Sequence, residues 1–373
     1  MCIFKNNFLM NEELKYQIAL TLVPSIGVVT AKKLIEHFGD AQTIFSANKK
    51  DLRDAGIASD AIESIKTFDD FSKVDEEILF IKKYKIQTFF ITQKDYPQRL
   101  LNCYDPPVLL YYKGNSNLND EKIVSIIGTR NNTPYGKKTA EEIVEKLSVQ
   151  NILIVSGLAY GIDTIAHKAA LKNNLQTIGV LANGLKTIYP SENKKLAEEM
   201  LAQGGLLSEF SHDTKPDRYN FPRRNRIVAG MADATIVVET SRKGGSMITA
   251  EIANSYGREI FAVPGRIGDE KSNGCNYLIQ SNKAQIFTDT EQFLYAMNWN
   301  NSKKKPKQQT MIFADLSLNE QKVVDVLRTN EALHIDTLKA SCGLSSGELA
   351  SAMLTLELAG IIVSLPGKLY QLA

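Results

Sequence analysis

The feature that most constrains the fold of this chain is an alternation, between residues 79 and 298, of short apolar runs with stretches of helical periodicity. A short run of consecutive apolar residues is typical of a strand that is buried on both faces. Strands that alternate with helices are typical of a parallel sheet whose crossovers are right-handed. We therefore expect an α/β, Rossmann-like domain with a mostly parallel sheet and helices on both faces. Its strands are expected at 123–127, 152–155, 177–181, 206–208, 235–239 and 260–263, and its helices at 136–147, 164–171, 193–202, 224–231 and 247–256.

The first segment, residues 1–78, has helical periodicity and is expected to form a small helical domain. Its clearest signal is PSIG at 24–27, followed by apolar residues at a spacing of three and four. This pattern predicts a helix-hairpin-helix (SAM-like) unit with a tight turn. Two interpretations stay open: the turn offers backbone N–H groups to a DNA phosphate beside Lys32 and Lys33, or it only joins two helices of a bundle.

The last segment, residues 311–373, is expected to be a winged-helix domain. Residues 299–310 before it are polar, basic and interrupted by proline, which favours a solvated linker. The expected recognition helix carries Glu348 and Glu357 and no Lys or Arg. Because phosphate binding needs cations, we favour contact with protein over contact with DNA for this domain. Its helices are expected at 319–327, 335–340 and 346–359, and its hairpin strands at 360–363 and 368–372.

Glycine-rich loops follow four of the predicted strands. Ligands bind beyond the carboxyl ends of parallel strands, and glycine lets backbone N–H groups approach a phosphate. Helix N-termini at the same edge favour an anion. Thr133-Pro134 is typical of an N-cap followed by an N1 proline, and Asp163 and Ser246 are expected to be N-caps. The loops are GTR at 128–130, SGLAYG at 156–161, ANG at 182–184 and RKGGS at 242–246.

The stretch FPRRNRIVAG at 221–230 places three arginines within four positions at the start of a predicted helix. Arginine at a helix start opposes the helix dipole, and a bound anion compensates for this. Phe221 is expected either to stack on a base or to seat the helix in the core. We therefore predict a site for single-stranded DNA with no catalytic or metal-binding residue. Its predicted residues are Gly128, Thr129, Arg130, Ser156, Gly157, Phe221, Arg223, Arg224, Asn225, Arg226, Lys243, Gly245 and Ser246.

Composition and missing motifs limit the other function classes. The formal net charge is only +2, so a polyanionic partner requires positive charge that is concentrated locally. The four cysteines form no CxxC pair, which argues against zinc and fits a reducing cytoplasm. We find no apolar run of membrane-spanning length and no signal-peptide pattern. A GxSxG elbow, a Walker sequence and a GxGxxG fingerprint are also missing, so no cofactor is expected, and His167 is expected to be a packed or capping histidine.

The ordered motifs of the central segment resemble the DNA-processing protein A (DprA/Smf) family of bacterial transformation proteins. Four positions depart from the common pattern: Thr129 and Gly244 replace serine, Ala182 replaces glycine and Lys186 replaces aspartate. The matching motifs are YPQRL at 96–100, PPVL at 106–109, IGTR at 127–130, SGLAYGID at 156–163, YPSEN at 189–193, FPRRNRIVAG at 221–230, GGSMITA at 244–250 and GREIFAVPG at 257–265.

The resemblance implies a non-enzymatic, cytoplasmic homodimer that binds incoming single-stranded DNA, shields it and helps to load a RecA-type recombinase during natural transformation. It places DNA contacts in the Rossmann-like pocket, at Arg130 and residues 221–226. Two other functions are weighed against it. A nucleotide phosphoribohydrolase would use Glu251 as its catalytic acid, although the Gly-Thr of the expected PGGxGTxxE loop is missing. A transcription regulator would act through residues 335–359.

Overall fold

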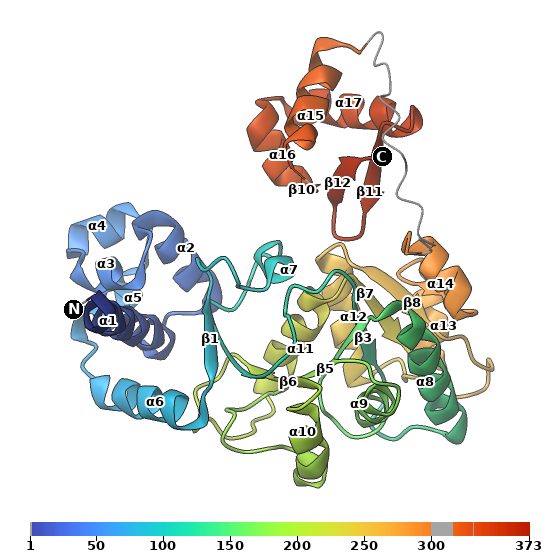
Figure 1. Ribbon diagram of the computed structural model, residues 1–373, viewed down its shortest axis with the longest axis horizontal. Helices are drawn as coiled ribbons and strands as arrows, with labels where there is room; N and C mark the ends of the chain where they lie inside the picture. Colours follow the sequence, from blue (N-terminus) through green and yellow to red (C-terminus); the bar gives the residue numbers. More distant parts are fainter. Residues whose placement is uncertain (1, 300–315, 331) are drawn as a thin grey trace.

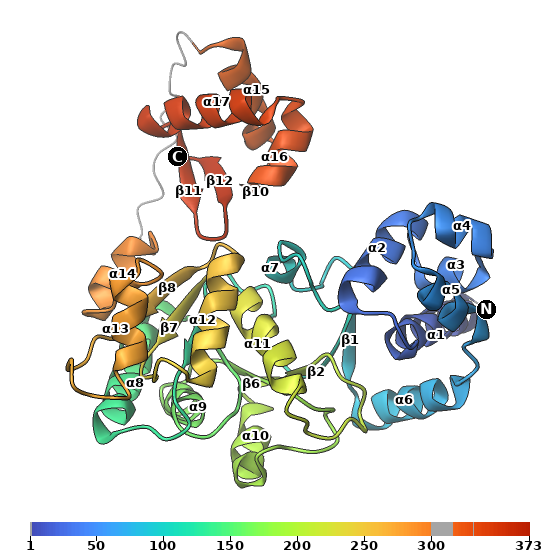
Figure 2. The ribbon, with the colours of Figure 1, turned by 180° about the vertical axis from the view of Figure 1, so that it is seen from behind.

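The computed structural model describes residues 2–299, 316–330 and 332–373 of the chain. Figures 1 and 2 show a helical N-terminal region, a central sheet with helices on both faces, and a small C-terminal unit. Apart from Trp299, the linker predicted at 299–310 lies outside the described residues. Among the helices that are described, none is both long enough and apolar enough to cross a membrane.

The N-terminal region is built from short helices around an apolar core that includes Ile18, Leu34 and Ile44. The predicted PSIG turn joins the first two helices, and Ser25 takes a positive φ of 63° within it. The last helix of the region continues to Tyr84, past the junction predicted after residue 78. The helices are α1 (Cys2–Leu22), α2 (Val28–Phe38), α3 (Ala41–Ser46), α4 (Lys49–Asp54), α5 (Ser59–Thr67) and α6 (Phe71–Tyr84).

The central sheet has nine strands in the order β1-β2-β6-β5-β4-β3-β7-β8-β9. The pairs from β6 through to β9 are parallel, whereas β1–β2 and β2–β6 are antiparallel. All six predicted strands are present, with ends that differ by at most two residues, while β1, β2 and β9 were not predicted. The strands are β1 (Gln87–Phe90), β2 (Leu109–Gly114), β3 (Ile123–Ile127), β4 (Leu153–Ser156), β5 (Thr177–Val180), β6 (Gly204–Ser208), β7 (Ala234–Val237), β8 (Glu259–Ala262) and β9 (Gln285–Ile286).

Helices cover both faces of this sheet, and the sheet lies between two large apolar cores. Side chains of α8, α9 and α14 form one core against the sheet. Side chains of α11, α12 and α13 form the other, which continues without a break into the N-terminal helices. The sheet is therefore mostly parallel and covered on both sides, as predicted. The helices are α7 (Gln98–Leu101), α8 (Pro134–Leu147), α9 (Ile162–Lys172), α10 (Lys194–Met200), α11 (Asn220–Met231), α12 (Gly245–Ser255), α13 (Asn273–Gln280) and α14 (Thr290–Ala296).

The strand order reverses at β3, which has β4 on one side and β7 on the other. From β3 the chain moves outward through β4, β5 and β6, and it then returns to add β7 and β8 on the opposite side. The loops that leave β3, β4 and β7 therefore diverge at the same edge of the sheet. Such a switch point is where open α/β sheets form a ligand-binding crevice.

The C-terminal unit is a winged helix, as predicted. Ser317 and Ser345 each form a capping box, with Glu320 and Glu348 respectively, and these boxes fix the starts of two of its helices. The hairpin turn at Gly367 lies beside the Arg258 guanidinium of the central region. The elements are α15 (Leu318–Arg328), β10 (Leu333–His334), α16 (Ile335–Cys342), α17 (Ser346–Leu358), β11 (Ile362–Leu365) and β12 (Leu369–Leu372).

Candidate nucleic-acid interface

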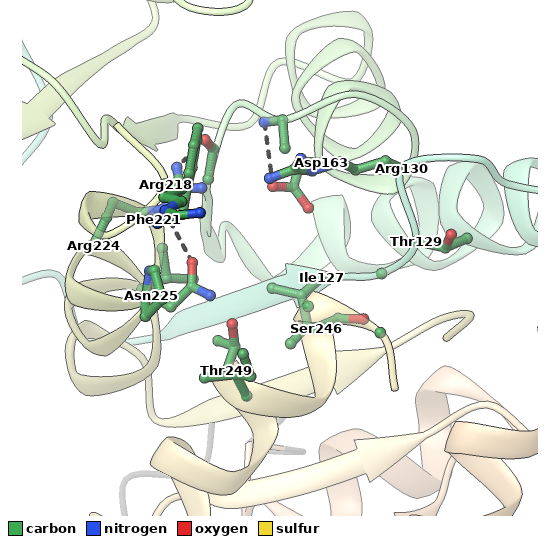
Figure 3. A pocket seen from close by; sticks show the side chains of 18 residues that line it. Ile127, Thr129, Arg130, Asp163, Arg218, Phe221, Arg224, Asn225, Ser246 and Thr249 are labelled. Carbon is green, nitrogen blue, oxygen red and sulfur yellow. Dashed lines mark hydrogen bonds between the residues drawn. The ribbon is translucent and has the colours of Figure 1, made fainter. Parts of the chain in front are cut away.

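A cavity of about 450 Å³, here called the rim pocket, lies at the switch point of the sheet. It is bounded by the loops that follow β3, β4 and β7 and by the start of α11 (Figure 3). The structure thus brings together four segments that are far apart in the sequence. The predicted residues that line the cavity are Gly128, Thr129, Arg130, Gly157, Phe221, Arg224, Asn225, Gly245 and Ser246.

Arg130 supplies an exposed cation at this cavity. Its guanidinium carbon lies 5.1 Å from the centroid of the Phe221 ring. Among the described residues it has neither a hydrogen bond nor an ion pair with a carboxylate. Because the salt bridge of an ordinary surface arginine is missing, its donors are available to an anion.

Phe221 is half-buried at the start of α11 and contacts two exposed side chains. Besides the Arg130 guanidinium, it faces the Tyr189 ring, with centroids 5.9 Å apart and planes inclined by 51°. Phe221 therefore has a second aromatic ring and a guanidinium beside it, and nucleobases stack on side chains of both kinds. Stacking of a base on Phe221 stays a prediction.

Arg224 forms part of the pocket wall but is buried, with 4% of its surface exposed. Its guanidinium donates hydrogen bonds to the carbonyl oxygens of Gly157 and Val180. Burial lowers the pKa of Arg224 to about 10, while the neighbouring carboxylate of Asp163 opposes this shift. The guanidinium therefore ties the ends of β4 and β5 to α11. Because it is charged and lies in the pocket wall, it also makes the electrostatic potential of the pocket more positive.

Four predicted site residues do not line the rim pocket, and their role in DNA binding stays a prediction. The Ser156 side chain is buried at the end of β4, and its hydroxyl donates to the Ile126 carbonyl oxygen of the neighbouring strand at 2.6 Å. Arg226 is buried in an ion pair with Glu209. Arg223 lines a different cavity beside the N-terminal helices. Lys243 is exposed and does not line the pocket.

Helix starts converge on the pocket, although two predicted N-caps were wrong. Thr133 caps α8 as predicted, since its side chain accepts from the Gly136 N–H at 3.1 Å. Helices α9 and α12 begin after Gly161 and Gly244, so Asp163 and Ser246 lie inside the first turns. The starts of α9, α11 and α12 carry no side-chain cap, but several of their first N–H groups bind backbone oxygens: the Ile162 N–H donates to the Thr129 carbonyl oxygen and the Met247 N–H donates to that of Gly244.

The loop after β3 is fixed by a buried carboxylate that sequence reasoning did not single out. Glu239 accepts hydrogen bonds from the backbone N–H and the hydroxyl of Thr133, each at 2.8 Å. Its own carbonyl oxygen accepts from the Thr129 N–H at 2.7 Å. These bonds hold the loop after β3, which carries Thr129 and Arg130, against the end of β7. The only signal in the sequence is the position of Glu239 directly after an apolar strand.

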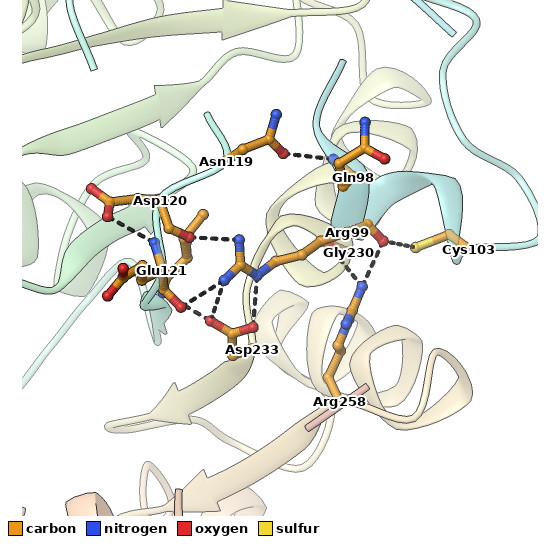
Figure 4. Close-up of polar contacts among 10 residues, drawn as sticks. Gln98, Arg99, Cys103, Asn119, Asp120, Glu121, Gly230, Asp233 and Arg258 are labelled. Carbon is orange, nitrogen blue, oxygen red and sulfur yellow. Dashed lines mark hydrogen bonds and ion pairs between the residues drawn. The ribbon is translucent and has the colours of Figure 1, made fainter. Parts of the chain in front are cut away.

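The far end of α11 is held by a second polar network, drawn in Figure 4. Arg99 on α7 pairs with Asp233, with Nε and Oδ1 separated by 2.6 Å, and Asp233 also accepts from the Ile123 N–H. The Arg258 guanidinium donates to the carbonyl oxygens of Gly230 and Arg99. The helix that carries Phe221 and Arg224 is thereby fixed at both ends.

Two charged residues that line the pocket were not predicted to be part of the site. Arg218 is exposed beside the pocket, and its guanidinium carbon lies 4.7 Å from the Tyr219 ring centroid. Asp163 lines the inner wall and accepts from the Ala159 N–H at 3.3 Å. Burial raises the pKa of Asp163, and the charge of Arg224 opposes this. A basic residue shortly before the arginine-rich stretch was the available signal for Arg218.

Glu251 and His167 are each engaged by other groups of the protein. Glu251 is directed to Lys283, with Oε1 and Nζ separated by 3.8 Å, and does not line the cavity. His167 is packed, as predicted: its Nδ1 lies 2.7 Å from the Thr177 hydroxyl, and burial lowers its pKa to about 3. Within the described residues, no cluster of three His, Cys, Asp or Glu side chains is placed to hold a metal ion.

Comparisons with known proteins agree on one family. Residues 87–298 match the family of DNA recombination-mediator protein A, and residues 307–368 match the DprA winged helix domain. Protein Smf of Escherichia coli (strain K12) is 38% identical over 284 residues, which cover 73% of this chain and 74% of that protein.

Two solved structures are also similar to this chain. DNA processing protein A (DprA) from Streptococcus pneumoniae gives a TM-score of 0.67 at 35% identity and covers 75% of this chain and 97% of that chain. DNA processing protein A from Helicobacter pylori, described for its single-stranded DNA binding mode, gives a TM-score of 0.53 at 32% identity. That match covers 58% of this chain and 96% of that chain.

Proposed function

The chain belongs to the DNA recombination-mediator protein A (DprA/Smf) family, and from this we propose that it processes DNA by binding a single strand in the rim pocket. The observation that carries the proposal is Arg130, an exposed cation without a carboxylate partner among the described residues, at the switch point of the sheet. The single-stranded DNA binding described for the Helicobacter pylori relative supports it.

The binding mode follows from the chemistry of the lining. A phosphate is held by Arg130 beside the positive ends of the α9 and α12 helix dipoles. A base stacks on the aromatic and guanidinium surface at Phe221. Neither contact reads a base edge, so binding is sequence-tolerant and dependent on salt.

A titration of labelled single-stranded and duplex oligonucleotides, followed by fluorescence anisotropy, tests the proposal. We expect tighter binding of the single strand at every salt concentration, because a duplex keeps its bases inside the stack. Equal affinity for the two forms would overturn the assignment of the pocket to single-stranded DNA.

The protein shields incoming DNA and helps to load a RecA-type recombinase during natural transformation, and it acts as a homodimer in the cytoplasm. Family membership supports these roles, and the buried free thiols of Cys103, Cys275 and Cys342 are consistent with a reducing compartment. Light scattering tests the homodimer. The rate of recombinase assembly on DNA that is coated with a single-strand-binding protein, with and without this protein, tests loading. A monomer by light scattering, or an unchanged assembly rate, contradicts the corresponding role.

The protein carries out no reaction on the strand. This is supported by Asp163, the one carboxylate among the residues that line the pocket, which is buried and held by the backbone. The alternative of a phosphoribohydrolase requires Glu251 at the substrate. Incubation with nucleoside monophosphates tests it: turnover by the wild-type protein that is abolished in Glu251→Gln would establish an enzyme.

A further inference from the structure

Two exposed tyrosines lie beside the rim pocket, on the loops that leave β4 and β5. Tyr160 follows β4 and Tyr189 follows β5, and because these strands are parallel neighbours, the two loops meet at the same edge of the sheet. The two residues are 42% and 45% exposed. A single exposed tyrosine is ordinary on a protein surface, but a pair of them next to a polar pocket offers rings for contact with a ligand.

A small cavity, here called the tyrosine cleft, lies between these two residues. It shares Arg130, Phe221 and Arg224 with the rim pocket, so the two cavities are direct neighbours. Its volume of about 30 Å³ is smaller than a nucleobase. A base can therefore lie only across the mouth of the cleft, against the tyrosine rings, and not inside it.

The Tyr160 ring is held in position through its hydroxyl. This hydroxyl donates to Glu192 Oε2 at 2.6 Å, and the Ser191 hydroxyl donates to the same oxygen at 3.1 Å. The hydrogen bond with Glu192 raises the pKa of Tyr160, and the nearby Tyr189 hydroxyl contributes in the same direction. Because the ring is already positioned by the protein, less side-chain freedom is lost when a base stacks on it.

The charges around the tyrosine cleft separate the phosphate of a nucleotide from its base. Arg130 is an exposed cation that lines both cavities. At the hydroxyl end of Tyr160, the hydrogen bond from this tyrosine lowers the pKa of Glu192, so this carboxylate is negatively charged at neutral pH. A phosphate is attracted to Arg130 and repelled by Glu192, whereas an uncharged base is tolerated on the ring between them.

We propose that Tyr160 and Tyr189 form a second stacking subsite for the bound strand, which takes the base next to the one at Phe221, while Arg130 holds the phosphate between the two nucleotides. The inference rests on the proposed binding of single-stranded DNA in the rim pocket and deepens it. It is supported by the place of Arg130 and Phe221 in the linings of both cavities. Every base has a face that can stack, so this subsite does not select a sequence.

The experiment is an abasic scan of the shortest oligothymidylate that the full chain binds with full affinity. One base at a time is removed while every phosphate stays, and the affinity is measured by fluorescence anisotropy. Two successive positions are each expected to lower the affinity of the wild-type protein about fivefold or more when their base is removed, because a stacked base contributes that much. A strand held through its phosphates alone would show no such positions.

Variants at Tyr160 test the second subsite separately from the first. Tyr160→Ala is expected to bind the intact oligomer about fivefold more weakly and to lose its sensitivity at one of the two positions. Tyr160→Phe, which keeps the ring and removes the hydroxyl, is expected to restore most of the affinity that Tyr160→Ala loses. Tyr295→Ala on α14 is the matched control, since that tyrosine is 76% exposed and lines neither cavity. Urea unfolding checks that each variant is folded.

The failure of this inference is distinguishable from the failure of the proposed function. If the wild-type protein shows at most one sensitive position, or if Tyr160→Ala keeps both, the second subsite is refuted while single-strand binding stands. If Tyr160→Phe binds as weakly as Tyr160→Ala, the hydroxyl and not the ring carries the contact, and the inference is overturned. If no oligonucleotide binds, the proposed function itself fails.

Discussion

Replacing Arg130 with alanine is expected to weaken single-stranded DNA binding and to leave the fold intact. The side chain is exposed, and its contact with the described protein is the cation–π contact with Phe221. Loss of such a contact at an exposed site costs about 0.5–1 kcal/mol of stability, against an ordinary unfolding free energy of about 5–15 kcal/mol. The loss of a charge-assisted phosphate contact is expected to cost about 1–3 kcal/mol of binding free energy, which is a roughly 5- to 150-fold weaker affinity.

The salt dependence separates a lost phosphate contact from a general loss of affinity. Each phosphate neutralised on a single strand contributes about 0.7 to the slope of log K against log salt concentration, so the slope of Arg130→Ala is expected to be smaller by about that amount. Anisotropy titrations at several salt concentrations measure both quantities, and urea unfolding checks stability. Arg53→Ala, at an exposed arginine on α4 outside the rim pocket, is the control for a change of net charge. An unchanged affinity and slope for Arg130→Ala, or an equal effect of Arg53→Ala, would refute the reasoning.

Three further predictions concern stability. Arg224→Met removes the hydrogen bonds to two buried carbonyl oxygens and leaves Asp163 without its cation. The unfolding free energy is therefore expected to fall by about 3–5 kcal/mol. An unchanged urea midpoint would contradict this. Asp233→Asn removes the charge that pairs with Arg99 and is expected to cost about 1–3 kcal/mol in the same assay, with a wild-type midpoint counting against the network as a brace. Burial lowers the pKa of His167 to about 3 in the folded state, so the unfolded state alone takes up the proton below pH 6.5. The unfolding free energy therefore carries no penalty from His167 above pH 6.5, and it falls by about 1.4 kcal/mol per pH unit as the pH drops from 6.5 toward 3. His167→Gln is expected to lack this part of the pH dependence. Identical pH profiles of stability for the two proteins would exclude it.

The parallel part of the sheet was predictable because its strands are buried on both faces. Strand β3, for example, is apolar at four of its five positions and begins and ends where the sequence predicted. Strands β1 and β2 were missed because they form an antiparallel pair at one edge, outside the alternation of strands and helices that guided the prediction. The winged helix was predictable from its three helical stretches and the two hairpin strands that follow them.

The position of the rim pocket in the fold was predictable from the sequence, but the contacts of the arginines on α11 were not. Successive residues of a helix point about 100° apart, whereas residues three apart lie on one face, so Arg223 and Arg226 share a side of α11 and Arg224 points away from them. In the structure Arg223 lines the cavity beside the N-terminal helices and lies 3.8 Å from Glu209 Oε2, Arg224 donates to the carbonyl oxygens of Gly157 and Val180, and Arg226 pairs with Glu209. The partners of the last two come from distant parts of the chain. Sequence spacing places the arginines on α11 but does not show which group each of them contacts.

The antiparallel pair β1–β2 makes the N-terminal helical region an integral part of the molecule and not a detachable module. Strand β2 covers the backbone of β6, and the apolar core behind it continues from Tyr111 into the N-terminal helices. A shortened protein that lacked both strands would present β6 as an open edge, which is a template for pairing with other chains. Removal of the helices alone would uncover an apolar surface on the same side. Exchange of this region between relatives must therefore carry β1 and β2 along with the helices.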